Sequence, residues 1–211
     1  MPRPTPIYRI IHVDNLGVCI QRGGFYAPNH VPDDGLRYRI IHNVEIQNVR
    51  RERNIPCGAG GTVHDYVSFY FGPRSPMLLQ LHTGQVKDYD EGQEPIIYIV
   101  STVEKVLHHG LQFVFSDGHG IASFTTWFDD LKNLGKVDWN MVYANYWADT
   151  LADMDRQRRK QAEFLIYRFC PFEVVTEIGV LNLQMKQRVE KILQQYNITN
   201  LPVGIHPEWY Y

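Results

Sequence analysis

Residues 156–169 read Arg156-Gln157-Arg158-Arg159-Lys160-Gln161-Ala162-Glu163-Phe164-Leu165-Ile166-Tyr167-Arg168-Phe169. A basic segment is therefore followed by one acid, Glu163, and then by an apolar run with the composition of a strand. The strand would hold the Glu163 carboxylate on a rigid support, and the cations before it would gather phosphate. A fixed carboxylate among cations suits chemistry in which positive charge develops on a sugar carbon beside a phosphorylated ligand. Taken alone, the basic segment is equally typical of a solvated helix face.

The bulk composition predicts one folded domain spanning residues 1–211. A length of 211 residues fits a single domain, and 44% hydrophobic with 13% aromatic residues suffices for a sizeable core. The formal net charge of −2 argues against a polybasic binder. Any contact with nucleic acid must therefore come from a local basic patch.

The cysteines and the N-terminus indicate a cytoplasmic protein. Cys19, Cys57 and Cys170 are an odd number without close spacing, so neither a disulfide framework nor a zinc motif is indicated. The proline-rich start lacks the apolar run of a signal peptide. No stretch reaches the roughly 18 apolar residues that a membrane span needs.

Hydrophobic patterns and turn residues predict a mixed α and β domain. The expected strands cover residues 7–12, 66–71, 96–100, 111–115, 164–169, 174–181 and, at an edge, 202–205. The expected helices cover residues 14–21, with Asp14 as its cap, 44–51, 76–81, 102–109, 151–162 and a final one capped by Asn182. Between them lies a long aromatic segment, Gly118–Thr150, and a loop of that length in a compact domain is usually functional.

Three local features could carry chemistry. His12 ends the first strand at a turn that presents backbone groups, although a histidine there is more often structural. The cluster from Arg50 to Arg53 is typical of a solvated face, yet an inward arginine would bind phosphate bidentately. Arg74 lies in a stiff turn between Pro73 and Pro76.

Other chemistries lack their motifs. Pro56–Gly61 is glycine-rich but lacks the Gly-Lys-Ser/Thr ending of a phosphate loop. The sequence contains neither the Gly-x-Ser-x-Gly elbow of serine hydrolases nor a Rossmann fingerprint after a strand. His108, His109 and His119 have no ligand-like spacing to a cysteine or carboxylate, so no metal is expected.

Four segments together resemble the DarT family of DNA ADP-ribosyltransferase toxins. They are Tyr8–Leu16, Asn48–Arg51, Tyr66–Leu78 and Lys160–Leu165, and their order and spacing match over nearly the whole chain. The aromatic strand with Pro73-Arg74-Ser75-Pro76 and the Lys160–Phe164 run are the specific parts. The chain looks more like the branch that modifies thymine in single-stranded DNA than the guanine-modifying branch.

This resemblance implies an α+β fold: a single domain with an ADP-ribosyltransferase-like split mixed β-sheet around an NAD+ cleft, with flanking helices. It implies a toxin that transfers ADP-ribose from NAD+ to a base in single-stranded DNA, in a sequence-dependent manner, and releases nicotinamide. NAD+ would be a co-substrate, with no metal. The implied partners are single-stranded DNA and a DarG-type antitoxin, a macrodomain ADP-ribosylglycohydrolase.

The resemblance also implies roles for individual residues. Glu163 would be the catalytic glutamate and Arg51 the catalytic arginine. The expected NAD+ contacts are His12, Val13, Asp14, Gln21, Asn29 and Arg51. The expected DNA contacts are Arg74, Ser75, Pro76, Met77, Leu78, His119, Tyr146, Trp147, Arg156, Arg158 and Arg159, with aromatic side chains stacking bases and arginines following phosphates.

Two other functions fit the same residues. One is an NAD+-consuming enzyme that acts on RNA or protein or simply hydrolyses NAD+. The other is a non-catalytic module that binds single-stranded nucleic acid through the aromatic segment and the basic helix.

Overall fold

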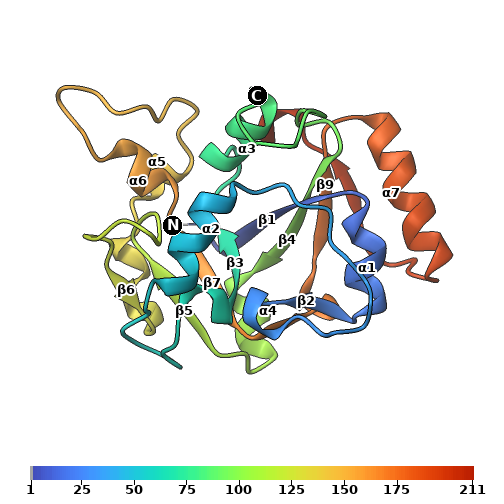
Figure 1. Cartoon of the computed structure of the whole chain (residues 1–211), viewed down its shortest axis with the longest axis horizontal. Helices are drawn as coiled ribbons and strands as arrows, with labels where there is room; N and C mark the ends of the chain where they lie inside the picture. Colours follow the sequence, from blue (N-terminus) through green and yellow to red (C-terminus); the bar gives the residue numbers. More distant parts are fainter. Residues whose placement is uncertain (1) are drawn as a thin grey trace.

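The computed structural model describes residues 2–211, and its centre is an eight-stranded mixed sheet (Figure 1). In spatial order its strands are β10 (Val203–Ile205), β9 (Glu177–Val180), β4 (Ile96–Thr102), β1 (Pro6–His12), β3 (Tyr66–Tyr70), β7 (Glu163–Tyr167), β5 (Phe113–Ser116) and β6 (Trp127–Phe128). A second, two-stranded sheet joins β2 (Gly24–Tyr26) to β8 (Phe169–Pro171). Most strands run antiparallel; β10 and β9 are parallel.

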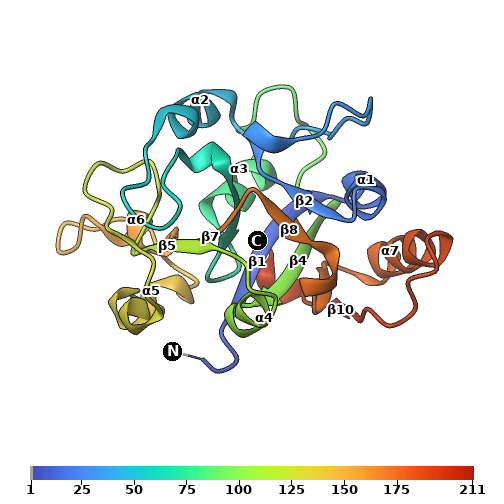
Figure 2. The same ribbon diagram turned by 90° about the horizontal axis from the view of Figure 1, so that it is seen from below.

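Helices and their loops surround the sheet. They are α1 (Asn15–Gln21), α2 (Val44–Glu52), α3 (Pro76–His82), α4 (Val103–His108), α5 (Trp139–Val142), α6 (Arg156–Lys160) and α7 (Leu183–Gln195). The short helices α5 and α6 lie at the opposite end of the molecule from α7 (Figures 1 and 2). In Figure 2, α2 and α4 lie on opposite sides of the central strands.

The large sheet splits between its two central strands. β1 pairs with β4 along its whole length, from Pro6 opposite Thr102 to His12 opposite Ile96. Within residues 2–211, β1 meets β3 in register only where Tyr8 faces Tyr70. Beyond that pair the two strands diverge, so backbone hydrogen bonds no longer close the gap between them.

Apolar side chains build three separate cores in residues 2–211, and the two with the most residues hold helices against the sheet. The larger core contains Phe164 and Ile166 of β7 and receives Leu16 of α1, Val106 of α4 and Val189 of α7. The smaller core gathers Leu78 and Leu81 of α3 with the Tyr210 end of the chain. Burial of these side chains is the main favourable contribution to folding, at roughly 25 cal/mol per Å² of apolar area.

The fold class expected from the resemblance is confirmed: a mixed sheet with flanking helices, split at its centre. The expected cap of α7 is confirmed as well, because the Asn182 side chain accepts a hydrogen bond from Met185 N. Gly110 follows α4 with a φ of 63°, a conformation that glycine adopts without strain. β10 lies at the edge of the sheet, as expected.

Three local expectations were wrong. The helix expected over residues 151–162 is only Arg156–Lys160. A bridge between Thr150 and Asp153 and a hydrogen bond that the Asp155 amide donates to the Asp153 carboxylate hold the preceding chain in turns. The strand expected over residues 164–169 breaks at Arg168, whose φ of 60° redirects the chain into β8. Asp14 precedes α1 but makes no capping bond.

No helix in the described part of the chain combines the length and the apolar character that crossing a membrane would require.

Candidate active site

A cavity of about 460 Å³ opens where the sheet splits. Its walls come from β1, β3, α2, the loop before α2, the start of α3 and the residues around Glu163. This volume falls in the range of small-molecule and cofactor sites. The cavity therefore reaches the acid that the sequence singles out.

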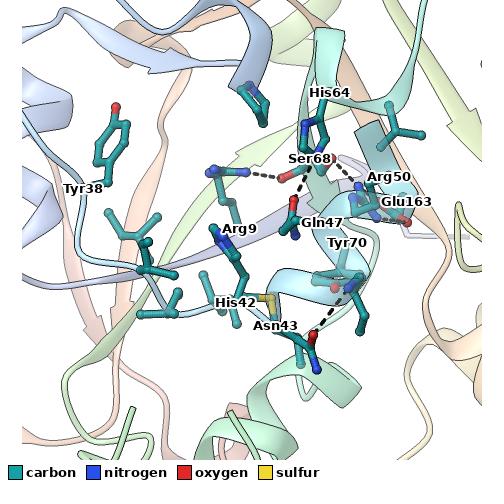
Figure 3. Close-up of a pocket in the computed structure, with 18 of the residues that line it drawn as sticks. Arg9, Tyr38, His42, Asn43, Gln47, Arg50, His64, Ser68, Tyr70 and Glu163 are labelled. Carbon is teal, nitrogen blue, oxygen red and sulfur yellow. Dashed lines mark hydrogen bonds and ion pairs between the residues drawn. The ribbon is translucent and has the colours of Figure 1, made fainter. Parts of the chain in front are cut away.

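Glu163 begins β7 and is held by three donors, two of them from Arg50, which Figure 3 shows beside it. Arg50 donates from Nη2 to Oε2 at 2.7 Å and from Nη1 to Oε1 at 3.0 Å, a bidentate pair. The Gly120 amide donates to Oε1 at 2.9 Å. The Glu163 side chain is only 2% exposed, so the carboxylate lies inside the molecule and borders the cavity.

The pair stays ionised despite its burial. Burial opposes the charged form of Glu163, but the charge and hydrogen bonds of Arg50 outweigh it, so the carboxyl pKa lies below its ordinary value. Burial likewise opposes the charged form of Arg50, yet Glu163 raises the arginine pKa. The site thus presents an anionic carboxylate to whatever ligand enters.

The arginine that contacts Glu163 is Arg50, whereas the resemblance pointed to Arg51. Successive residues on a helix point about 100° apart. Gln47 and Arg50, three positions apart on α2, both line the cavity, so Arg51 falls on the exposed side of the helix. Asn43 fixes the start of α2 by accepting from Glu45 N and Ile46 N.

Histidines make part of the cavity wall polar without adding charge. Burial lowers the pKa of His42, of His64 and of His119, and for His64 the value is about 4. His64 Nε2 also donates a hydrogen bond to Gln47 Oε1 at 3.1 Å. At neutral pH these imidazoles are therefore uncharged.

The His12–Asp14 turn lies beside the cavity, though not in its wall. His12 is buried and its Nδ1 accepts from the Asp14 amide at 3.1 Å. Val13 belongs to the core and donates its amide to Pro95 O. The Asp14 carboxylate pairs with Arg39, which lines the cavity and also pairs with Glu91.

Two of the expected NAD+ contacts lie away from the cavity. Gln21 is on the outer side of α1 and donates to the hydroxyl of Tyr196 at 2.7 Å. Asn29 is exposed and donates to Asp65 at 3.1 Å. Neither side chain borders the cavity in the structure.

In the segment from Arg74 to Leu78, some residues line the cavity and others only stabilise the fold. Pro76 and Met77 line the cavity, while Ser75 caps α3 by accepting from Leu78 N at 3.2 Å, and Leu78 packs in the smaller core. Arg74 has a φ of 53° and donates to Tyr210 O.

Of the remaining expected DNA contacts, His119 lines the cavity, whereas the others lie outside its wall, in α6 and in the loop before it. Tyr146 is exposed with the Arg156 guanidinium over its ring, whereas Trp147 is buried and donates to the Tyr211 hydroxyl.

The other two arginines of α6 are neutralised locally. Arg158 pairs with Asp117 and Asp155. Arg159 pairs with three aspartates: Asp138, Asp153 and Asp155.

Several cavity residues were missed by sequence reasoning. Ser68 accepts from Arg50, and Tyr70 lies opposite Glu163 across the β3–β7 pair. Alternation along β3 was the available signal, because Ser68 and Tyr70 share the face opposite the apolar Val67 and Phe69. Arg9, a lone cation within an apolar strand, was a second such signal.

No metal site is evident in residues 2–211: three or more histidine, cysteine or carboxylate side chains nowhere gather there as ligands would. The charges at the cavity are instead those of arginines and one glutamate.

Comparison with known proteins gives consistent matches over the whole chain. The family model described as "ssDNA thymidine ADP-ribosyltransferase, DarT" matches residues 8–211. A DNA ADP-ribosyl transferase from Thermus sp. (strain 2.9) is 41% identical over 211 residues, covering 100% of this chain and 98% of that protein. A transferase–DNA ADP-ribosyl glycohydrolase fusion protein of Thermosipho africanus is 21% identical, covering 95% of this chain and 49% of the fusion.

Solved structures agree with these matches. The structure of Thermus sp. 2.9 DarT with ADP-ribosylated single-stranded DNA superposes with a TM-score of 0.93 at 40% identity, covering 100% of this chain and 98% of that one. The same protein in complex with NAD+ gives a TM-score of 0.88 at 38% identity, covering 100% and 99%.

Proposed function

The chain belongs to the DarT family of single-stranded DNA thymidine ADP-ribosyltransferases, and on that premise we propose that Glu163 and Arg50 carry its reaction. The reaction transfers ADP-ribose from NAD+ to a base in single-stranded DNA, thymine by the family description, and releases nicotinamide. The observation that carries the assignment is the buried Arg50–Glu163 pair at the wall of the central cavity.

Glu163 supplies the electrostatic part of catalysis. When the glycosidic bond between nicotinamide and ribose breaks, the ribose carbon gains oxocarbenium character. A carboxylate fixed by Arg50 and by the Gly120 amide stabilises that positive charge without having to reorient. The same carboxylate orients the ribose through its hydroxyl groups.

Arg50 holds the carboxylate and stabilises negative charge on the acceptor. A thymine ring nitrogen must lose its proton before it can bond to the ribose carbon, so anionic character develops on the base. Arginine stays protonated and is an unsuitable base. In our proposal the proton leaves to solvent or to Glu163, and the spare donor capacity of Arg50 lowers the cost of the anion.

The acceptor base enters beside Pro76 and Met77 on one side and His119 and Gln161 on the other, which together line the cavity. A base reaches such an enclosed site only when it is unstacked, and this favours single-stranded substrate. Arg74, Tyr146 and Arg156 remain proposed contacts with the strand outside the cavity.

The structure disfavours a purely binding role. A buried ion pair commonly contributes no more stability than apolar residues of the same size would. Its presence at a cavity wall is therefore better explained by chemistry than by folding.

The proposed partners follow from the same family. A DarG-type glycohydrolase would remove the modification, consistent with a relative in which both activities are fused in one chain. We also propose the cytoplasm as the site of action, because NAD+ and DNA are both available there. We further propose that the modification depends on the DNA sequence around the target base.

Incubation of the purified chain with labelled NAD+ and separate single-stranded DNA, duplex DNA, RNA and protein tests the function. We expect label on single-stranded DNA that contains thymine and much less on duplex of the same sequence. An oligonucleotide in which every thymine is replaced serves as the matched control. Label on RNA or protein alone would contradict the proposal.

A further inference from the structure

Arg9 places a positive charge inside the cavity. It lies in the middle of β1, and its Nη1 donates to the carbonyl oxygen of Ser68 at 2.9 Å across the split in the sheet. Figure 3 shows its guanidinium between Tyr38 on one side and Ser68 with the Arg50–Glu163 pair on the other. Its buried Nε has no hydrogen-bond partner among residues 2–211.

This guanidinium is the one cation of the cavity wall without a carboxylate partner in the described chain. Arg50 is paired with Glu163, and Arg39 is paired with Asp14 and Glu91. In residues 2–211, no carboxylate lies within ion-pair distance of Arg9. Among these residues the cavity wall contains a single carboxylate, that of Glu163, which Arg50 already binds. The three cavity histidines are neutral at pH 7.

An arginine held in the cavity wall without a carboxylate partner is energetically costly. Burial lowers the pKa of Arg9, yet a guanidinium remains protonated in proteins, so the charge persists. An anionic ligand group would offset this cost, and the diphosphate is the anionic part of NAD+.

We propose that Arg9 binds the diphosphate of NAD+ and thereby positions the nicotinamide ribose against Glu163. Arg9 and Arg50 hold the same residue, one through the Ser68 carbonyl and the other through the Ser68 hydroxyl. The cation is thus adjacent to the pair that performs the chemistry. In NAD+ one ribose ring separates the scissile carbon from the nearest phosphate. Glu163 would face the scissile carbon, and Arg9 would face the phosphate. The inference rests on the proposed function.

A ligand pair that differs by one phosphate tests this assignment. Nicotinamide mononucleotide carries the phosphate, and nicotinamide riboside lacks it. Titration calorimetry should show that the wild type binds the mononucleotide at least tenfold more tightly. In Arg9→Met, which keeps the length of the side chain and removes its charge, the preference should fall below about twofold. Arg3→Met removes an exposed arginine outside the cavity and should retain the full preference.

Loss of affinity for both ligands to the same degree in Arg9→Met would overturn the proposal, because it would show a purely structural role. Arg9→Lys keeps the charge but not the forked donors, so an intermediate preference is expected. If neither variant folds, the wild type decides: equal binding of both ligands contradicts a phosphate contact, and a tenfold preference supports it. Failure of the wild type to modify DNA would count against the proposed function and leave this preference unaffected.

Discussion

At the scale of single residues, the proposed chemistry depends on which arginine of α2 faces inward. Arg50 and Arg51 are neighbours in the sequence, but only Arg50 reaches the Glu163 carboxylate. The residue pattern shows a basic cluster without showing its orientation. Because successive helix residues point about 100° apart, Arg50 lies in the buried ion pair while its neighbour Arg51 is exposed to solvent.

Substitution of each arginine in turn tests this assignment. Arg50→Met should lower turnover of NAD+ and DNA by at least a hundredfold, equivalent to about 2.7 kcal/mol in the barrier, because the carboxylate loses its bidentate partner. Arg51→Met is the matched control and should change turnover less than about threefold. Steady-state rates with a labelled oligonucleotide measure both. The reverse ranking would return the catalytic role to Arg51.

At the scale of elements, α6 differs from what its sequence suggests. Its arginines look like a phosphate-tracking face, but Arg158 and Arg159 are bound by aspartates from the preceding turns and from the segment after β5. Arg156 makes no ion pair in the described chain and contacts backbone carbonyls and Tyr146. We therefore infer that Arg158, which pairs with Asp117, fixes the loop around Gly120, whose amide holds Glu163. Arg159 instead ties the start of α5 and the turn before α6 to α6, and we infer that Arg156 contacts DNA.

The salt dependence of DNA affinity separates these two roles. Each phosphate contact adds about 0.7 to the slope of log affinity against log salt for single strands. Arg156→Gln should therefore reduce the slope by about that amount, whereas Arg158→Gln should leave the slope unchanged while slowing turnover. Fluorescence anisotropy over a salt series measures the slopes. An equal decrease in both variants would contradict the distinction.

Element boundaries show what sequence reasoning can reach. The strand over residues 66–71, the helix over residues 44–51 and the Asn182 cap follow from periodicity and local hydrogen bonding, and the structure confirms them with shifts of a residue or so. The break at Arg168 and the short α6 were not predictable, because they depend on pairing with distant β2 and on aspartate side chains competing for backbone amides. Likewise, the cavity arises from a gap between strands that no local pattern encodes.

At the scale of the whole molecule, buried neutral histidines make stability depend on pH. The folded pKa of His64 is about 4, below its ordinary value of 6.5. The unfolded chain therefore binds the proton first as the pH falls, and stability decreases between about pH 6.5 and pH 4. The loss is at most about 1.4 kcal/mol per pH unit for each such histidine.

Urea unfolding at pH 7 and pH 5 tests this linkage. Wild type should lose stability on acidification, and His64→Gln should lose about 1–2 kcal/mol less, because glutamine cannot bind a proton. An exposed histidine of α4, His108, provides the control variant, His108→Gln, which should behave as wild type. Identical losses in His64→Gln and wild type would contradict the buried, neutral assignment.

The central claim is that the Glu163 carboxylate, fixed in the cavity, drives the transfer of ADP-ribose to single-stranded DNA. Its most direct test is mass spectrometry of a thymine-containing oligonucleotide after incubation with NAD+ and either wild type or Glu163→Gln, with circular dichroism to confirm folding and Glu173→Gln as an exposed control. We expect ADP-ribosylated oligonucleotide from wild type and the control, and at least a thousandfold less from folded Glu163→Gln. Comparable product from folded Glu163→Gln would contradict the claim.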